Sequence, residues 1–314
     1  MLIKTPILEL TSKKYKIFIK REDLLQFSWG GNKLRIAQEY YADMAAKYCN
    51  CMIGYGNARS NLCRVLSNLA ASKNIECHII SPADDDGSRV ETFNSSIVKQ
   101  CGAQIHFCNK NNVAESVEQV LSECREKGLR PYYIYGDKFG KGNESIPVSA
   151  YVKVYNEILS QSKNLGVKFD YIFLATGTGM TQAGLIAGRQ INRGSEKIIG
   201  ISVARNREQE TNVIKNFCEA YFESENLKLD IGEIDVIDEY LCGGYGKYND
   251  QISVLINDML VNYGIPLDPT YTGKAYYGML ETINKEQLSG NILFLHTGGT
   301  PLFFDYMQAL GGIK

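Results

Sequence analysis

A glycine-rich turn in the middle of the chain has the features of a phosphate-binding loop. The stretch from Tyr171 to Gly184, YIFLATGTGMTQAG, is typical of a buried strand, a tight turn and a helix start. Glycines let the backbone approach a ligand closely, and the turn amides and the helix dipole favour an anion. An ordinary strand–helix turn has the same pattern, so this stretch alone leaves phosphate binding open.

The known nucleotide and hydrolase motifs do not fit this chain. No GxxxxGK[ST] occurs, and the spacing of Gly177, Gly179 and Gly184 does not match GxGxxG. No GxSxG turn is present to carry the nucleophile of a hydrolase triad. A phosphate other than that of a nucleotide is therefore favoured.

A lysine follows a glycine pair near the N-terminus. Lys33 stands directly after Gly30-Gly-Asn, at an expected helix start. An amine that is partly desolvated near a helix N-terminus is disfavoured as ammonium and becomes available to attack an aldehyde. This is Schiff-base chemistry, although most single lysines are simply solvated and the interpretation needs a partner motif.

Three other strand exits carry polar side chains. Arg59, Ser60 and Asn61 end one strand and open a helix, where amides and side chains suit a small carboxylate. Helix capping alone would explain Ser60, but not its two neighbours. The stretches 268–274 and 295–301 place hydroxyls at further turns, and such threonine–glycine turns are common.

The sequence predicts no metal site. His78, His106 and His296 are scattered singly, and the first two lie within strand-like runs. The pair Cys49 and Cys51 lacks the CxxC spacing and a second pair.

The elements that must position these residues alternate along the chain. Strand-like runs cover residues 15–20, 51–54, 77–80, 104–107, 132–135, 171–175, 198–203 and 292–296, and helix-length segments include 60–72, 89–100, 114–127 and 148–160. Such alternation predicts mostly parallel sheets covered on both faces, the α/β class. Uneven loops and the Gly/Asn/Ser-rich stretch 136–145 favour two doubly wound lobes over an eight-fold barrel.

The boundaries follow from the same pattern. Residues 1–35 and 146–314 are expected to form a large cofactor-binding domain, and residues 36–145 a small domain. Ligands of open α/β sheets lie beyond the carboxyl ends of the strands, where the polar turns are.

Composition limits the partners and the compartment. Of 314 residues 44% are hydrophobic, and 34 Lys+Arg against 35 Asp+Glu give a net charge of -1 without a basic run. Nucleic acid is an unfavourable partner. Nine cysteines, an odd number in apolar segments, indicate reduced thiols in the cytoplasm. No leader-like N-terminus or long apolar run is seen, so export and membrane insertion are not expected.

Taken in order, the motifs resemble those of one family. They are Lys20-Arg-Glu-Asp23, Gly30-Gly-Asn-Lys33, Ser60-Asn61, Thr178-Gly-Met-Thr181, Gly243-Gly-Tyr-Gly246, the stretch 268–274 and His296-Thr-Gly-Gly299. The set, spread over nearly the whole chain, resembles the pyridoxal-phosphate-dependent, tryptophan-synthase-β-like group (fold type II) of D-cysteine desulfhydrase and 1-aminocyclopropane-1-carboxylate deaminase. The resemblance implies a homodimer and a cofactor in the cleft between two lobes.

The resemblance also implies roles for individual residues. Lys33 would form the Schiff base with pyridoxal 5'-phosphate, and Asn61 would contact the pyridoxal 3′-oxygen. The phosphate site would consist of Thr178, Gly179, Met180 and Thr181. Substrate-facing residues would be Asn57, Arg59, Ser60, Tyr245, Tyr271 and Thr272, with Lys33, Ser60 and Tyr271 catalytic.

The residue at the pyridine nitrogen separates the two activities. A carboxylate there keeps the nitrogen protonated and the ring a strong electron sink, whereas a hydroxyl does not enforce protonation. The deaminases resemble Tyr-Glu-Gly-Lys with His-Leu-Gly-Gly, but this chain has Thr272 and Thr297 at those places. It resembles the desulfhydrase branch, with Thr297 at the nitrogen.

The sequence also departs from the family. Where the family shows Gln-Ser-Asn-His or Gln-Ser-Asn-Gln, this chain has Arg59 before Ser60-Asn61 and Leu62 after them. Arg59 could clamp a second carboxylate of the substrate, pair with a carboxylate of the protein, or point to solvent.

The leading prediction is a lyase that converts a small β-substituted amino acid to a 2-oxo acid and ammonia by α,β-elimination. The alternatives are a β-replacement synthase, the cyclopropane deaminase, a cofactor-binding protein without turnover, and a nucleotide-dependent oxidoreductase.

Overall fold

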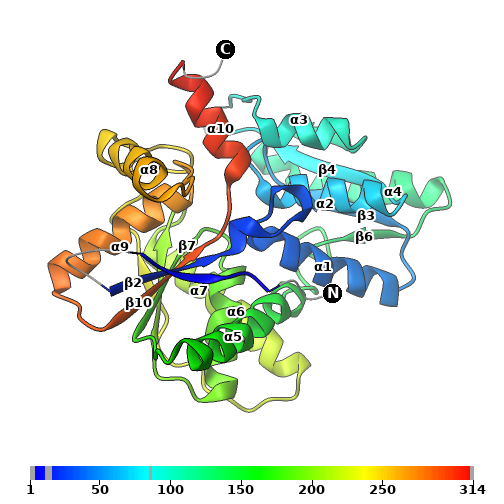
Figure 1. Ribbon diagram of the computed structural model, residues 1–314. Helices are drawn as coiled ribbons and strands as arrows, with labels where there is room; N and C mark the ends of the chain where they lie inside the picture. The colour runs from blue at the N-terminus through cyan, green and yellow to red at the C-terminus, as the bar shows by residue number, and fades with distance from the viewer. Residues whose placement is uncertain (1–3, 11–15, 85–86, 312–314) are drawn as a thin grey trace. The chain divides into compact units, whose positions relative to one another are not determined.

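The chain forms two compact units. The structure is a computed structural model that describes residues 4–10, 16–84 and 87–311. One unit comprises Met1–Asn32 and Pro147–Lys314, and the other Lys33–Ile146 (Figure 1). That the domain boundaries lie at 35/36 and 145/146 stays a prediction.

The first unit is built on a six-stranded sheet. Its order is β1-β2-β10-β7-β8-β9, and every neighbouring pair is parallel except β1 with β2. The strands are β1 (Ile7–Leu10), β2 (Lys16–Arg21), β7 (Tyr171–Thr176), β8 (Lys197–Ser202), β9 (Asp235–Ile237) and β10 (Asn291–His296). The central strands β7 and β10 are buried over all but their first residue, as expected for a parallel sheet with both faces covered.

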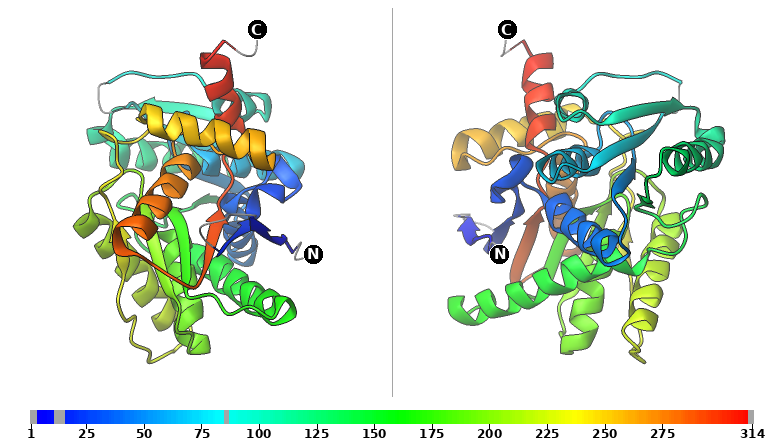
Figure 2. Two further views of the ribbon diagram at one scale, coloured as in Figure 1. Left: turned by 60° about the vertical axis from the view of Figure 1, so that its left-hand side comes forward. Right: turned by 90° about the vertical axis from the view of Figure 1, so that its right-hand side faces the viewer.

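Helices cover both faces of this sheet (Figure 2). They are α5 (Ser145–Leu165), α6 (Met180–Asn192), α7 (Arg207–Ser224), α8 (Asp250–Tyr263), α9 (Thr272–Glu286) and α10 (Thr300–Ala309). Successive side chains of a strand point to opposite faces of the sheet, so Gly200 and Ile201 of β8 mark its two faces. Gly278 of α9 packs so closely on Ile201 that an added Cβ would touch it, and Gly200 packs in the same way against Gln182 of α6. Therefore α9 and α6 lie on opposite faces.

The second unit is built on a four-stranded parallel sheet of order β5-β4-β3-β6. Its strands are β3 (Cys51–Tyr55), β4 (Glu76–Pro82), β5 (Gln104–Cys108) and β6 (Pro131–Tyr133), and its helices are α1 (Asn32–Ala46), α2 (Asn61–Ser72), α3 (Phe93–Gln100) and α4 (Val113–Glu126). Ile79 of β4 packs with Cys63 of α2, whereas its neighbour His78 reaches Cys124 of α4. The two helices therefore cover opposite faces.

The predicted fold class is confirmed, while some element boundaries differ. The segment 89–100 was expected to be helical throughout, but α3 begins at Phe93. Thr92 caps that helix through its side chain and Ser95 returns the bond, a capping box that fixes the helix start. The short strands β1 and β9 were not predicted, because neither has a distinct run of β-branched residues.

Among the described residues, no helix combines the length and the apolar character needed to cross a bilayer.

Candidate active site

The glycine turn of the first unit lies between β7 and α6, as the sequence predicted. Gly179 is the N-cap of α6 with φ +76° and offers no side chain to the first-turn amides. A Cβ there would lie 3.1 Å from Ile214 Cγ1 and 3.2 Å from Val213 Cγ1. Glycine therefore fits this position both by its backbone angle and by space, and the helix start suits an anion.

A buried carboxylate holds this turn in place. Thr176 Oγ1 donates to Glu210 Oε1 at 2.7 Å, and Arg205 Nη1 donates to Glu210 Oε2 at 2.9 Å and to the carbonyl of Gly177. Glu210 is fully buried. Because the carboxylate is satisfied by these two donors, it fixes the turn without adding an unpaired charge.

Asn32 joins three parts of the site. Its Nδ2 donates to Thr181 Oγ1 at 2.8 Å, and its backbone N–H donates to the carbonyl of Thr297 at 3.0 Å. Lys33 is the next residue in the chain. The residue before the predicted Schiff-base lysine is thus bonded both to the predicted phosphate turn and to the predicted nitrogen partner.

Glycines allow this close approach of two backbones. A Cβ on Gly31 would lie 3.0 Å from the carbonyl oxygen of Thr297, and one on Gly298 would lie 2.5 Å from Gly31 Cα. Gly31 and Gly298 both have positive φ, at +94° and +98°. The glycine pairs 30–31 and 298–299 therefore pack against each other, and side chains at these positions would push the two backbones apart.

His296 orients the turn that carries Thr297. Its Nε2 lies 2.8 Å from the carbonyl of Pro266 and its Nδ1 accepts from Gly298 N–H at 3.2 Å. These partners place the ring proton on Nε2. Thr297 itself is buried.

The buried carboxylate of Asp268 organises the start of α9. It accepts hydrogen bonds from the backbone N–H groups of residues 270–272 at 2.8–3.1 Å and from Thr272 Oγ1 at 2.8 Å. Burial raises the pKa of Asp268, and these hydrogen bonds oppose the rise. A Cβ on Gly299 would lie 2.2 Å from Asp268 Oδ2, so this carboxylate also supports the turn after β10.

Two tyrosines meet beside this turn. The hydroxyls of Tyr245 and Tyr271 are hydrogen-bonded, and their rings pack edge to face with centroids 5.8 Å apart. Lys274 Nζ donates to the carbonyls of Leu241 at 2.9 Å and Gly244 at 2.8 Å. The lysine thereby fixes the loop that presents Tyr245 to Tyr271.

The second unit carries its candidate residues at the start of α2. Ser60 Oγ accepts from Cys63 N–H at 3.1 Å, so Ser60 is the N-cap. Asn61 Oδ1 accepts from Asn94 Nδ2 at 3.0 Å. This bond turns the amide so that Asn61 Nδ2 remains as a donor, which suits the 3′-oxygen of a pyridoxal ring.

Arg59 pairs with a carboxylate of the protein. Its Nη1 lies 2.7 Å from Asp84 Oδ2, and Asn57 Nδ2 donates to Asp84 Oδ1 at 2.7 Å. This contact supports the pairing of Arg59 with a carboxylate of the protein. Asp84 thus orders the loop between β3 and α2.

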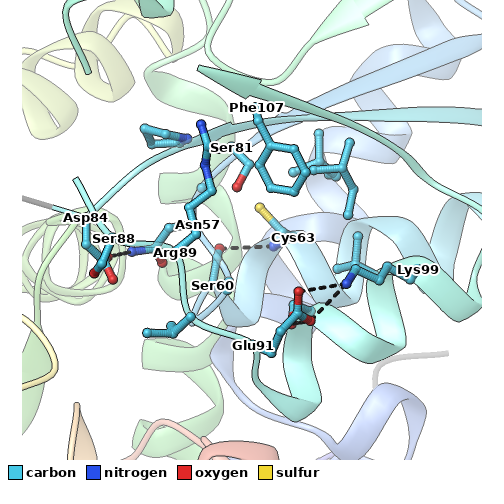
Figure 3. Close-up of a pocket in the computed structure, with 18 residues that line it drawn as sticks. Asn57, Ser60, Cys63, Ser81, Asp84, Ser88, Arg89, Glu91, Lys99 and Phe107 are labelled. Atoms are coloured by element: carbon cyan, nitrogen blue, oxygen red, sulfur yellow. Dashed lines mark hydrogen bonds and ion pairs between the residues drawn. The ribbon is translucent and has the colours of Figure 1, made fainter. Parts of the chain in front are cut away.

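A cavity of about 110 Å³ adjoins this loop within the second unit (Figure 3). Asn57 and Ser60 line it together with Ser81, Arg89 and Phe107. The Arg89 guanidinium stacks over the Phe107 ring, 4.8 Å from its centroid. Polar and apolar groups therefore meet beside the predicted substrate-carboxylate position.

The comparisons with known proteins agree with this geometry. A family model described as pyridoxal-phosphate dependent enzyme matches residues 2–298. The chain belongs to this family.

Similar proteins include a Pyrococcus furiosus protein provisionally named 1-aminocyclopropane-1-carboxylate deaminase, which is 32% identical over 92% of this chain and 86% of its own. D-cysteine desulfhydrase of Klebsiella pneumoniae is 29% identical over 93% of this chain and 89% of its own. The crystal structure of an ACC deaminase homologue superposes with a TM-score of 0.87 at 29% identity, covering 99% of this chain and 94% of that one.

The protein is therefore a pyridoxal-phosphate-dependent enzyme, and its residues fit that cofactor. The start of α6 suits an anion, and Asn32, the residue before Lys33, contacts Thr181 of that helix and the carbonyl of the buried Thr297. The roles assigned to single residues stay predictions.

Sequence reasoning did not assign roles to Asn32, Asn94, Glu210 and Lys274. Asn32 stood within a quoted motif, directly before Lys33, and that position was a usable signal. Asn94 and Glu210 lie 33 and 34 residues from the groups they orient, Asn61 and Thr176, and nothing in the local sequence marks them.

Replacing Asn32 by alanine is expected to weaken cofactor binding by about 10-fold, because one buried hydrogen bond to Thr181 is lost at the phosphate turn. Titration of the apoenzyme with pyridoxal phosphate measures this. Exposed Asn226→Ala is the control. Unchanged affinity in Asn32→Ala would contradict the positioning role.

Lys274 predicts a pH-dependent stability. Burial lowers the pKa of its ammonium from 10.5 to about 8. Between pH 8 and 10.5 the Lys274 amine is protonated in the unfolded chain and neutral in the folded chain. The free energy of unfolding should therefore increase as the pH rises through this range. Relative to Lys274→Met, the wild type should gain up to about 3 kcal/mol across this window. Urea unfolding at several pH values tests the sign, with exposed Lys285→Met as control.

Proposed function

We propose that this enzyme is a lyase that cleaves a small β-substituted amino acid by α,β-elimination, with D-cysteine as the best candidate substrate. D-Cysteine and water would give pyruvate, ammonia and hydrogen sulfide. The similarity to a protein named D-cysteine desulfhydrase supports this substrate class.

The observation that carries the proposal is the chemical surroundings of Thr297. Thr297 is buried on the turn after β10, and Asn32 N–H binds its carbonyl. Asp268, the acid that supports this turn, already accepts four hydrogen bonds from its own segment. In this proposal a hydroxyl, that of Thr297, rather than a carboxylate would face the pyridine nitrogen.

A hydroxyl partner for the pyridine nitrogen favours a substrate with a good leaving group. Bound pyridoxal phosphate supplies an electron sink for the α-carbon of the amino acid. A hydroxyl partner does not enforce a protonated ring, so the sink is the weaker one. Loss of a thiolate needs less stabilisation than the opening of a cyclopropane.

Each candidate residue has a defined task in this proposal. Lys33 would hold the cofactor and carry the α-proton. The α2 start, with Ser60 and Asn61, would bind the substrate carboxylate and the 3′-oxygen. Tyr271, hydrogen-bonded to Tyr245, would face the leaving group and would pass it a proton.

Incubation of the holoenzyme with D-cysteine tests the substrate. Sulfide and pyruvate should appear in equal amounts, and L-cysteine in a parallel assay measures the stereochemical preference. Absence of both products would refute D-cysteine as substrate while leaving the cofactor class intact.

The deaminase is the second candidate, because the relatives from Pyrococcus and the structural neighbour carry that name. Formation of 2-oxobutyrate from 1-aminocyclopropane-1-carboxylate would favour it over the lyase. Thr272 bears on this choice: its Oγ1 donates to Asp268, so a glutamate at this position would bring a second carboxylate beside Asp268.

We further infer a cytoplasmic homodimer. Nine free thiols support a reducing compartment. Sedimentation velocity of the holoenzyme measures the oligomeric state.

A further inference from the structure

Three metal-ligating side chains gather within the second unit, on the face of its sheet that α4 covers. Cys51 of β3, His78 of β4 and Cys124 of α4 are all buried, and their ligand atoms lie within 4.8 Å of one another. The two sulfur atoms are 3.6 Å apart, and Cys124 Sγ is 3.5 Å from His78 Nε2. None of these groups has a part in the proposed reaction.

These separations match a tetrahedral zinc site. Zinc lies at about 2.3 Å from sulfur and about 2.0–2.1 Å from imidazole nitrogen. Tetrahedral angles then place two sulfurs about 3.8 Å apart, and sulfur and nitrogen about 3.6 Å apart. The observed 3.6 and 3.5 Å are close to both values.

The surroundings of His78 complete such a site. His78 Nδ1 lies 2.9 Å from His106 Nε2, the kind of second hydrogen bond that fixes the tautomer of a metal-bound imidazole. Glu76 Oε1 lies 3.0 Å from His78 Nε2 and accepts from Gln104 Nε2 at 3.0 Å, but it is not among the ligand atoms that lie within 4.8 Å of one another. The Glu76 side chain is 34% exposed, so it can turn to bring its carboxylate to an ion.

We propose that Cys51, His78 and Cys124 bind one Zn²⁺ ion, with the Glu76 carboxylate at the fourth position. Both thiols lose their protons to solvent, and the imidazole binds through Nε2 and keeps its proton on Nδ1 toward His106. The bound ion would pin α4 to β3 and β4.

One observation separates this site from a simple thiol pair. A disulfide has no use for the imidazole or for its hydrogen bond to His106. Thiolate and imidazole donors favour zinc over magnesium or calcium.

Cobalt(II) titration of the reduced, metal-free holoprotein tests the site, because cobalt replaces zinc and thiolate ligation gives it a charge-transfer band. One equivalent should produce the band, and one equivalent of zinc should abolish it, while magnesium should not. The band should disappear in Cys51→Ser, Cys124→Ser and His78→Gln. Cofactor absorbance reports in each variant whether the fold is retained.

Cys77→Ala is the matched control. Cys77 is also buried and adjoins His78 on β4, but it packs with Cys63 and Ile79 on the other face. It should keep the band unchanged. His106→Phe should weaken cobalt binding by about 10–100-fold, since it removes the partner that orients the imidazole.

Absence of a thiolate band in the reduced wild type would overturn the proposal, and so would a band that survives all three ligand variants. A Cys51–Cys124 disulfide that forms in air and is unaffected by prior zinc addition would do the same. None of these outcomes depends on the substrate of the enzyme.

Discussion

The Lys33→Ala variant is expected to lose at least about 10³-fold in turnover, because it removes both the amine that attacks the cofactor aldehyde and the group that carries the α-proton. The visible absorbance of the holoenzyme should change to that of unattached cofactor. Borohydride, which reduces a Schiff base to a stable amine, should no longer fix the cofactor to the protein. Sulfide release and mass spectrometry of the reduced protein measure the two effects.

Lys274 is the competing amine, because it is buried and its pKa is lowered by burial to about 8. Its Nζ donates to two backbone carbonyls, which is a structural task. Lys274→Met should therefore still be labelled by borohydride, and exposed Lys285→Ala should be fully active. If labelling is lost in Lys274→Met but kept in Lys33→Ala, the Schiff base forms on Lys274, and our assignment of Lys33 is wrong.

The turns of the candidate site could be predicted from the sequence because each turn carries a local signature. Gly177 to Thr181, Gly30 to Lys33 and His296 to Gly299 combine glycines with polar residues at strand exits, and such patterns follow from backbone geometry within a few residues. The α/β class was predictable for the same reason, since strand–helix alternation is a local property.

Groups that act through long-range contacts were not predictable. Glu210 fixes Thr176 from α7, and Asn94 orients Asn61 from α3. The cluster on the α4 face is the clearest case. Cys51 and Cys124 are 73 residues apart, so a search for CxxC spacing excludes them, although the fold brings their sulfurs to 3.6 Å.

The Gly179→Ala variant is expected to lower the affinity for pyridoxal phosphate by at least about 10-fold. Gly179 has φ +76°, where alanine costs about 1–2 kcal/mol. The new Cβ would also press on Val213 and Ile214 at 3.1–3.2 Å, so the turn and its amides must shift. Titration of the apoenzyme gives the affinity, and urea unfolding gives the loss of stability.

Gly166→Ala separates backbone strain from the phosphate site. Gly166 has φ +65° and nothing within 4 Å of a Cβ, so alanine there brings similar strain without a clash. Both variants should lose stability, but only Gly179→Ala should lose cofactor affinity. The deciding measurement compares the affinities of each variant for pyridoxal phosphate and for pyridoxal. If the turn binds the phosphate, the ratio of these two affinities should be smaller in Gly179→Ala than in the wild type. An unchanged preference would mean that the uncapped start of α6 serves the fold and that another part of the chain binds the phosphate.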